Sequence, residues 1–359
     1  MTAEQLTMGV EEEFLLVGED GRLSGFGPEV VDATEEGHGE VEPELKRCQV
    51  EGVSDICRTP EEVLEQLTGL RGELAAAAGK RGLRLLPSGC PVVPETGEQE
   101  ITPNPRYLRL AQWFGATARS LATCGCHVHV AIPDRETGVV VSNRVRPWLP
   151  VLLALTVNSP FNGADTGYAS WRYQEWSRWP SAGPPPMFSG LDEYEATVDT
   201  MLRAGALMDR AMIYWDVRLS ERHPTLEFRI ADVAAVPEDA VLLATMVRGL
   251  VARALDTGGP PPELPQAVLR ANLWRASREG LTGATLHPVT GELGPVQSQV
   301  DDLVEHLSPV LGGDLEFVKA GVARLRERGT GAARQRAAHQ RRGELTDVVD
   351  ALVVTTRST

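Results

Sequence analysis

The sequence predicts an α+β fold, in which a sheet carries helices on its apolar face and polar groups on its other face. Several segments alternate polar and apolar residues with the period of two that is typical of half-buried β-strands. Segments between them place apolar residues at helical spacing, most clearly after the capping pattern that begins at Thr59. No repeat, low-complexity linker or composition shift divides the chain, so we expect a single domain over residues 1–359.

Each element follows from a local pattern. Strands are expected at residues 9–14, 45–57, 83–86, 123–132, 213–219 and 225–232. Helices are expected from residue 60 to residues 79–82 and over residues 106–122, 143–157, 191–210 and 241–255. Residues 158–186 fit no element, and the tryptophans and arginines of this long loop favour ligand binding over disorder.

Composition limits the kind of partner. The chain has 35 basic and 50 acidic residues and a formal charge of −15, which argues against a nucleic-acid or anionic-membrane partner. Its most apolar run, residues 148–157, is too short to span a bilayer. The N-terminus lacks the basic start and apolar run of a signal peptide, so we expect a cytoplasmic protein whose five cysteines are reduced.

The first strand carries three consecutive carboxylates within residues 9–14. In an extended strand Glu11 and Glu13 share one face, and Glu12 points to the other face with the apolar residues. Two carboxylates on one face of a core strand repel each other and lose hydration, so positive charge must compensate them. Arginines, a structural ion network and metal ions are the candidates, whereas a solvated edge strand would need none of them.

Three further strands repeat this arrangement of one polar and one apolar face. Their polar faces carry Glu51, the aligned pair His127 and His129, and Glu227 with Arg229, while Glu44 lies seven residues before Glu51. A lone strand histidine is usually a satisfied polar residue, and Glu227 beside Arg229 could equally be a structural ion pair. Four such strands in one chain favour a polynuclear cation site, because clustered carboxylates need counter-charge.

The residue types indicate the metal and the ligand. An oxygen-rich site with an imidazole suits magnesium or manganese, whereas zinc prefers more histidine or cysteine. Arg172, Arg218 and Arg229 suggest an anionic ligand. A site with metal ions and arginines suits a polyanion such as ATP. The sequence nevertheless has no Walker-A loop and no Gly-x-Gly-x-x-Gly after a strand. A nucleotide would therefore bind through metals and a sheet.

Several motifs are similar, in order, to those of the carboxylate-amine ligases related to glutamate-cysteine ligase, the type 2 branch. They are Gly9-Val-Glu-Glu-Glu-Phe14, Gln49-Val-Glu51, Gly125-Cys-His-Val-His-Val130, Asn158-Ser-Pro-Phe161, Trp215-Asp-Val-Arg218, Thr225-Leu-Glu-Phe-Arg-Ile230 and the tail segment 329–336. The resemblance implies a glutamine-synthetase-like fold with a largely antiparallel, curved sheet, helices on one face and the active site on the other. It also implies ATP-dependent joining of a glutamate-like carboxylic acid to a cysteine-like amine, in an amide bond of the γ-glutamyl type.

The resemblance assigns roles by position. The residues that look like magnesium ligands are Glu11, Glu13, Glu44, Glu51, His127 and Glu227. Arg229 and Glu227 look like catalytic residues, and the arginines that look like substrate-binding residues are Arg172, Arg218 and Arg229. A carboxylate must attack the γ-phosphate of ATP before an amine displaces the acyl phosphate, and bound magnesium removes the repulsion between the two anions. Whether the protein is a homodimer is left open.

Two other functions stay open. The His-x-His pair at residues 127 and 129 would suit a zinc metallohydrolase, although a second histidine pair on later core strands is missing. A non-catalytic ligand-binding protein on the same fold would keep the arginines and would tolerate loss of the carboxylates, all of which this sequence retains.

Overall fold

The protein is described by a computed structural model that covers residues 2–35, 37–95, 97–120 and 122–354. The strands are β1 (Met8–Val17), β2 (Glu40–Pro43), β3 (Gln49–Val53), β4 (Arg84–Leu86), β5 (Gly125–Ala131), β6 (Val217–Leu219), β7 (Thr225–Asp232), β8 (Ala284–Leu286) and β9 (Leu293–Pro295). The α-helices are α1 (Gly27–Val31), α2 (Pro60–Gly79), α3 (Pro105–Phe114), α4 (Ala116–Ser120), α5 (Arg135–Val145), α6 (Leu149–Thr156), α7 (Trp171–Trp176), α8 (Leu191–Arg203), α9 (Pro237–Asp256), α10 (Gln266–Glu279), α11 (Val296–Leu311), α12 (Asp314–Arg328), α13 (Gly331–Gln340) and α14 (Leu345–Leu352). Short 3-10 helices are η1 (Ala3–Gln5), η2 (Arg146–Trp148), η3 (Arg210–Met212) and η4 (Gly280–Thr282).

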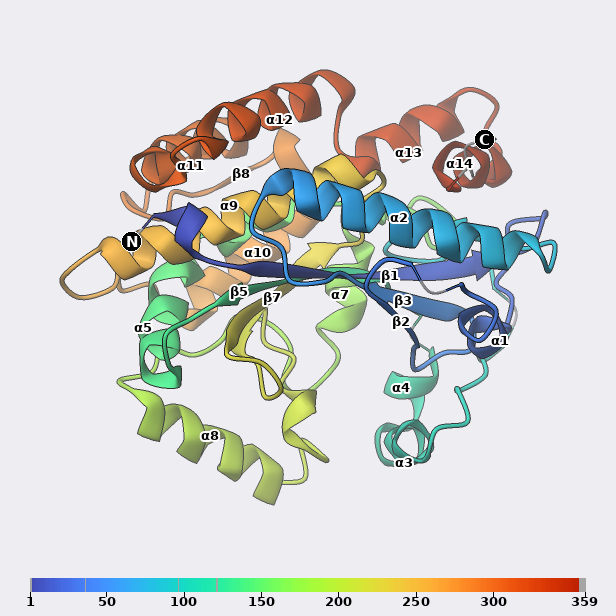
Figure 1. The fold of residues 1–359 in the computed structure, drawn as a ribbon, viewed down its shortest axis with the longest axis horizontal. Coiled ribbons are helices and arrows are strands. Elements are labelled where there is room, and N and C mark those ends of the chain that lie inside the picture. Colours follow the sequence, from blue (N-terminus) through green and yellow to red (C-terminus); the bar gives the residue numbers. More distant parts are fainter. Residues whose placement is uncertain (1, 36, 96, 121, 355–359) are drawn as a thin grey trace.

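The main sheet is antiparallel in every pairing and has the order β2-β3-β1-β5-β7-β6, with β4 also paired to β1 (Figure 1). The register aligns polar residues of neighbouring strands: Glu13 lies opposite Glu51, Glu11 opposite His127, and His129 opposite Glu227. The α+β fold with a largely antiparallel sheet is therefore confirmed. The strands, which are scattered along the sequence, bring their polar faces together in one surface.

Helices α2 and α9 lie along the apolar face of the sheet, with α11 and α12 beyond α9 (Figure 1). Apolar side chains of the central strands, such as Val10, Val128 and Phe228, are fully buried in this layer. The other face is only partly open, because α3, α4 and α8 lie along its margin (Figure 1). The main helical layer therefore packs on the apolar face, as expected, and the polar face is left to the cleft.

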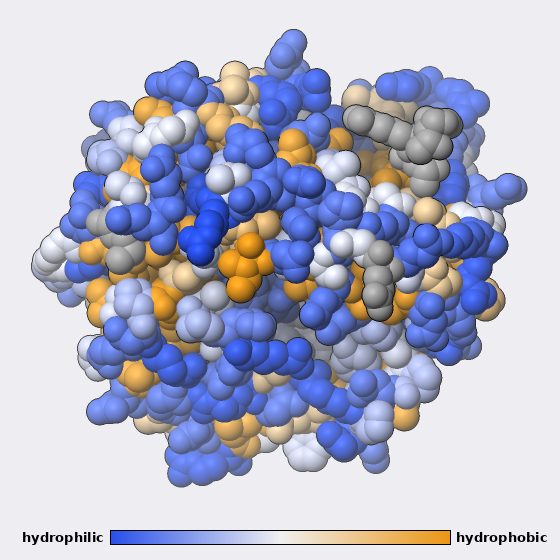
Figure 2. Space-filling view, viewed as in Figure 1, coloured by the Kyte–Doolittle hydropathy of each residue, from blue (hydrophilic) through white to orange (hydrophobic). Residues whose placement is uncertain are grey.

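The surface in Figure 2 is predominantly hydrophilic, with hydrophobic residues in small, separate groups. Charged residues make up 24% of the chain, the usual share for a globular protein. Of the described helices, none combines the length and the apolar character needed to cross a membrane.

Helix α2 follows the sequence prediction closely. The hydroxyl of Thr59 accepts a hydrogen bond from the backbone N–H of Glu62, whose carboxylate reaches back to the backbone of Thr59. Pro60 occupies the first turn, where its missing N–H costs nothing. The helix ends at Gly79, as expected, and its apolar face packs on the sheet through Leu67, Leu70 and Leu74.

Three other predicted helices have the wrong bounds. The helix expected over residues 106–122 is two helices, because Gly115 adopts a φ of 56° that ends α3; residue 121 lies outside the described residues. The helix expected over residues 191–210 ends at Arg203, close to Gly205 with a φ of 70°. The helix expected over residues 143–157 is α6, which starts at Leu149, preceded by η2 and the separate helix α5.

The predicted strand over residues 45–57 is also shorter, since β3 covers only Gln49–Val53. The preceding segment contributes a separate edge strand, β2, that the sequence prediction missed. Its register places Glu42 opposite Glu51.

The long loop over residues 158–186 contains the short helix α7 and is anchored at its start. The buried carboxylate of Asp232, at the end of β7, accepts hydrogen bonds from the backbone N–H of Asn158 and the hydroxyl of Ser159, both at 2.7 Å. It also accepts one from the hydroxyl of Ser170 at 2.7 Å. These bonds fix α7, which begins one residue after Ser170, against the polar face of the sheet.

Candidate functional site

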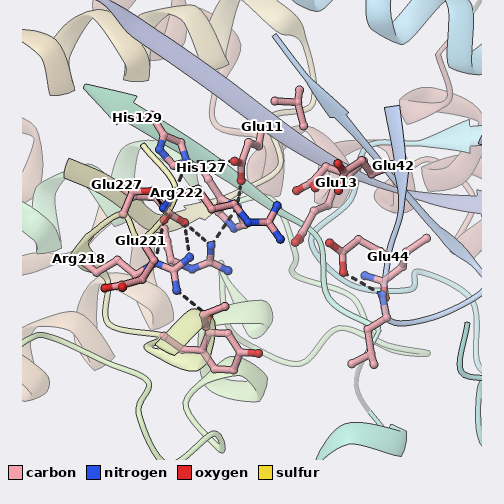
Figure 3. Close-up of a pocket in the computed structure, with 18 of the residues that line it drawn as sticks. Glu11, Glu13, Glu42, Glu44, His127, His129, Arg218, Glu221, Arg222 and Glu227 are labelled. Atoms are coloured by element: carbon pink, nitrogen blue, oxygen red, sulfur yellow. Dashed lines mark hydrogen bonds and ion pairs between the residues drawn. The ribbon is translucent and has the colours of Figure 1, made fainter. Parts of the chain in front are cut away.

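The polar face of the sheet forms the floor of a cleft of about 290 Å³. Its floor comes from β1, β3, β5 and β7, and its walls come from β2, α3, α7 and the turn between β6 and β7. In Figure 3, Glu42 and Glu44 lie on one side of the cleft, Arg218, Glu221 and Glu227 lie on the other, and Glu11 and Glu13 lie between them. The cleft therefore has an acidic side and a side that contains arginines.

Glu11 is held by two histidines of β5. One carboxylate oxygen lies 3.0 Å from Nδ1 of His127 and the other lies 3.0 Å from Nε2 of His129. Burial alone would raise the pKa of Glu11, but the hydrogen bonds from both histidines outweigh it and hold the pKa of Glu11 well below its usual range. Burial and Arg229 together lower the pKa of His127. Glu11 is therefore ionised beside a neutral His127, which is a suitable state for a pair of metal ligands.

A second group of carboxylates lies along β1 and β3. Glu13 is opposite Glu51, and its carboxylate accepts a hydrogen bond of 2.6 Å from the backbone N–H of Gly125. Burial, followed by repulsion from Glu44, Glu11 and Glu13, raises the pKa of Glu51 well above its usual range. Burial, followed by repulsion from Glu13, raises the pKa of Glu44 to about 7. The carboxylates at this end of the cleft are thus not balanced by nearby basic side chains.

The donor set fits a hard divalent cation. Ligand atoms of Glu11, His127 and Glu227 lie within 4.8 Å of one another, and so do those of Glu13, Glu51 and His127. His127 belongs to both groups, and its Nε2 atom is buried without a hydrogen-bond partner in the part of the chain that the structure describes. Carboxylate oxygens with one imidazole suit magnesium or manganese, and a cation would remove the repulsion that raises the pKa of Glu51.

Glu227 links the metal-ligand candidates to two arginines. The guanidinium of Arg218 donates hydrogen bonds to both carboxylate oxygens of Glu227, at 2.8 and 3.1 Å. Nη1 of Arg229 donates to one of the same two oxygens. Burial would raise the pKa of Glu227, but Arg218 and Arg229 outweigh it and lower the pKa. Arg229 lies over the rings of Trp176 and Tyr214, at 5.8 Å from each centroid, and its Nε atom has no hydrogen-bond partner among the described residues. Arg229 therefore keeps donor capacity toward the cleft.

Arg218 has less donor capacity left. Besides Glu227, its Nη1 donates to the backbone carbonyls of Ala211 and Ile213, both at 2.7 Å. Arg218 would therefore affect a substrate only indirectly, by orienting Glu227.

Arg172 is fully buried behind the residues that line the cleft. Its Nη2 donates to the carbonyl of Arg229 at 3.3 Å, while its Nε and Nη1 have no hydrogen-bond partner in the described ranges. The guanidinium occupies the space that a side chain on Gly125 would fill, since a Cβ there would lie 2.2 Å from Nη2. The same Cβ would lie 3.0 Å from Nε2 of His127, so the guanidinium sits beside the metal-ligand candidates with two unused donors.

The sequence prediction missed several residues of the cleft. His129 was aligned with His127 but was not proposed as a site residue, although it contacts Glu11. The alternation of Glu40, Glu42 and Glu44 could have revealed β2. Trp176 and Trp179 belong to the long loop whose aromatic and arginine content favoured ligand binding, and both line the cleft. Tyr107, Tyr214 and the turn that carries Arg222 and His223 gave no signal that local spacing could detect.

An antiparallel sheet with carboxylates, imidazoles and arginines gathered on one face fits the class of glutamine-synthetase-like ligases that form carbon–nitrogen bonds. Over residues 7–351 the chain matches the family model described as glutamate-cysteine ligase family 2. The chain belongs to this family, which confirms the expected family and fold class.

Relatives and solved structures agree with this assignment. A protein of Rhodococcus jostii (strain RHA1) with the provisional name glutamate--cysteine ligase 2-1 is 51% identical and covers 98% of this chain and 96% of its own length. A relative from Saccharopolyspora erythraea with the same provisional name is 48% identical, over 98% of this chain and 95% of its own. The crystal structure of glutamate--cysteine ligase from Francisella tularensis in complex with AMP has a TM-score of 0.71 at 13% identity, covering 97% of this chain and 87% of its own. At that identity the likeness concerns the fold alone.

Proposed function

We propose that the protein uses ATP to join a glutamate-like carboxylic acid to a cysteine-like amine, through an acyl phosphate. One observation carries the proposal. Two groups of candidate metal ligands, which have His127 in common, lie in the same cleft as Arg229, and Arg229 contacts His127. The acid must attack a phosphate while both are anionic, and such a site compensates that charge. The names of the relatives, which refer to glutamate and cysteine, and the AMP in the Francisella structure support the choice of substrates and nucleotide.

In this proposal, six residues would hold magnesium, or manganese in its place; they are Glu11, Glu13, Glu44, Glu51, His127 and Glu227. When bound, the cations supply charge neutralisation at the phosphate oxygens. The chain itself orients the ligands. His129 and His127 fix the carboxylate of Glu11, the backbone N–H of Gly125 fixes Glu13, and Arg218 fixes Glu227.

Two arginines would bind the reacting anions. Arg229 offers its Nε to the transferred phosphoryl group or to the acid, and its stacking on Trp176 and Tyr214 limits its movement. Arg172 has two unused donors beside His127, which suits the carboxylate of the acid substrate. Catalysis would then consist mainly of positioning and electrostatic stabilisation. A single domain, a cytoplasmic location and a homodimer stay predictions.

The test is ADP formation by the purified protein with magnesium, screened across carboxylic acids with glutamate first and across amines with cysteine first. We expect turnover that requires both a divalent cation and an acid, and we expect added hydroxylamine to trap the acyl phosphate as a hydroxamate. Zinc-dependent hydrolysis without ATP would overturn the proposal in favour of a metallohydrolase. Ligand binding with no ADP formation under any combination would favour the non-catalytic alternative.

A further inference from the structure

Arg222 is the cleft arginine whose guanidinium has no ion-pair or hydrogen-bond partner within the described ranges. The other arginines that line the cleft are all paired: Arg106 with Asp209 at 2.8 and 2.9 Å, and Arg218 and Arg229 with Glu227. Arg222 is exposed at the mouth of the cleft, in the turn between β6 and β7. A lone guanidinium in a cleft with an excess of carboxylates is available to an anionic ligand.

The turn that carries Arg222 is fixed on both sides. The hydroxyl of Ser220 accepts hydrogen bonds from the backbone N–H groups of Arg222 and His223, at 3.4 and 3.3 Å. Glu221, on the same turn, is held by Nε of Arg210 at 2.9 Å and by Arg135 at 3.4 Å. The backbone at Arg222 is therefore anchored to α5 and η3, so its side chain starts from a fixed position at the cleft.

The two sides of the cleft have opposite character at the mouth. Glu42 and Glu44 project from β2 and the segment after it, and Figure 3 shows them on one side of the cleft, with Arg222 nearer its middle. Within the described residues, neither Glu42 nor Glu44 has an arginine or lysine ion pair. An ammonium group would be attracted to the acidic side and a carboxylate to Arg222, so the mouth suits a zwitterion.

We propose that Arg222 binds the carboxylate of an α-amino acid that serves as the amine substrate, and so selects amino acids over simple amines. The inference rests on the proposed function. The reacting acid must reach the buried Arg229 and the metal-ligand candidates, which leaves the exposed mouth to the amine that attacks last. A forked guanidinium matches a carboxylate in two hydrogen bonds, and this match is absent for an amine without a carboxylate.

The experiment compares each amino acid with the amine that lacks its carboxylate: cysteine with cysteamine, serine with ethanolamine and alanine with ethylamine. The quantity measured is the ratio of kcat/KM for the amino acid to kcat/KM for the matched amine. We expect a ratio above one in the wild-type protein and a fall of about 10- to 100-fold in Arg222→Ala, the size of a lost charge-assisted hydrogen bond. Arg222→Lys, which keeps the charge but loses the fork, should give an intermediate ratio.

The matched control is Arg203→Ala, which removes an exposed arginine from the end of α8, outside the cleft, and should leave the ratio unchanged. Because the readout is a ratio, a general loss of activity in Arg222→Ala does not imitate the expected result. A wild-type preference for simple amines, or an unchanged ratio in Arg222→Ala, overturns the inference about Arg222. If the wild-type protein still forms hydroxamate, the ligase proposal stands. Absence of hydroxamate with every acid overturns the ligase proposal and this inference with it.

Discussion

Glu12 and Arg71 form a buried, two-pronged ion pair between β1 and α2, with Nε of Arg71 2.8 Å from one carboxylate oxygen and Nη2 2.6 Å from the other. The side chains are 1% and 4% exposed, so solvent does not weaken the pair. Arg71 also donates to the carbonyl of Ala234 at 2.8 Å. Glu12 therefore faces away from the cleft and ties the first strand to the helical layer, as the period of the strand predicted.

Replacing Glu12 with glutamine should damage stability. The change leaves the guanidinium of Arg71 buried without its counter-charge, and we expect the free energy of unfolding to fall by about 3 kcal/mol. Urea denaturation measures this loss, with Glu65→Gln on the exposed face of α2 as the control, expected within about 0.5 kcal/mol of the wild type. A stable Glu12→Gln protein without metal-dependent activity would show that the faces of β1 are wrongly assigned.

The neighbouring substitutions Glu11→Gln and Glu13→Gln should instead impair cation binding. Each removes a candidate ligand, so we expect Mn²⁺ affinity to fall by roughly 100-fold or more, with loss of magnesium-dependent turnover. Titration followed by electron paramagnetic resonance of free Mn²⁺ measures the affinity directly. In metal-free protein Glu13→Gln should raise the melting temperature, because it relieves repulsion with Glu51, whereas Glu11 is already compensated by two histidines. Wild-type Mn²⁺ affinity in both variants would reject the metal site.

A methyl group on Gly125 should displace Arg172. The added Cβ would lie 2.2 Å from Nη2 and 2.8 Å from Cζ of a guanidinium that is fully buried and has little room to move. We expect Gly125→Ala to lower kcat/KM for the acid by about tenfold or more, on the ground that small misplacements in a site are costly. Gly72→Ala, with nothing within 4 Å of the new Cβ, is the control and should stabilise α2 slightly. Equal activity in the two variants would remove Arg172 from the site.

Arg229→Lys should show whether the site needs only the positive charge of Arg229 or also its forked donor geometry. The variant keeps a cation near Glu227 but loses the forked donor and the stacking on Trp176. We expect a normal fold by circular dichroism and a loss of activity of roughly 100-fold, comparable to removing one transition-state donor. Turnover close to that of the wild type would return Arg229 to the role of a structural partner of Glu227.

Asp216 should make stability depend on pH. Burial raises the pKa of its carboxyl to about 7, although the hydroxyl of Tyr173, at 3.0 Å, and the nearby Arg172 partly oppose the shift. Between about pH 4 and pH 7 the folded protein keeps a proton that the unfolded chain releases, so this group's contribution to stability is lost as pH rises through that window. Asp216→Asn removes the titration.

The difference in melting temperature between Asp216→Asn and the wild-type protein should therefore grow from pH 5 to pH 8 in favour of the variant. The energy at stake is at most about 4 kcal/mol, the value of three pKa units. Asp192→Asn, on the exposed face of α8, is the control and should show no such trend. A constant difference across this range would mean that Asp216 is ionised throughout.

The sequence by itself determined which residues share a face and which motifs belong to one family. The period of two separated Glu11 and Glu13 from Glu12, and the capping pattern at Thr59 set the start of α2. These features depend on backbone geometry over a few residues, so a local pattern contains them. The same reasoning did not find β2 or the break at Gly115, because alternate glutamates and a single glycine are each compatible with several local structures.

Only the tertiary structure decided which of those residues meet. The pairing of Glu12 with Arg71 joins residues 59 positions apart, and the contact of His127 with Arg229 joins residues 102 positions apart. The burial of Arg172 over Gly125, and the lack of a guanidinium partner for Arg222 among the described residues, likewise follow from how distant strands and turns pack. Such contacts depend on strand register and on which arginine reaches which carboxylate, and both are set by the packing of the whole chain rather than by neighbours in the sequence.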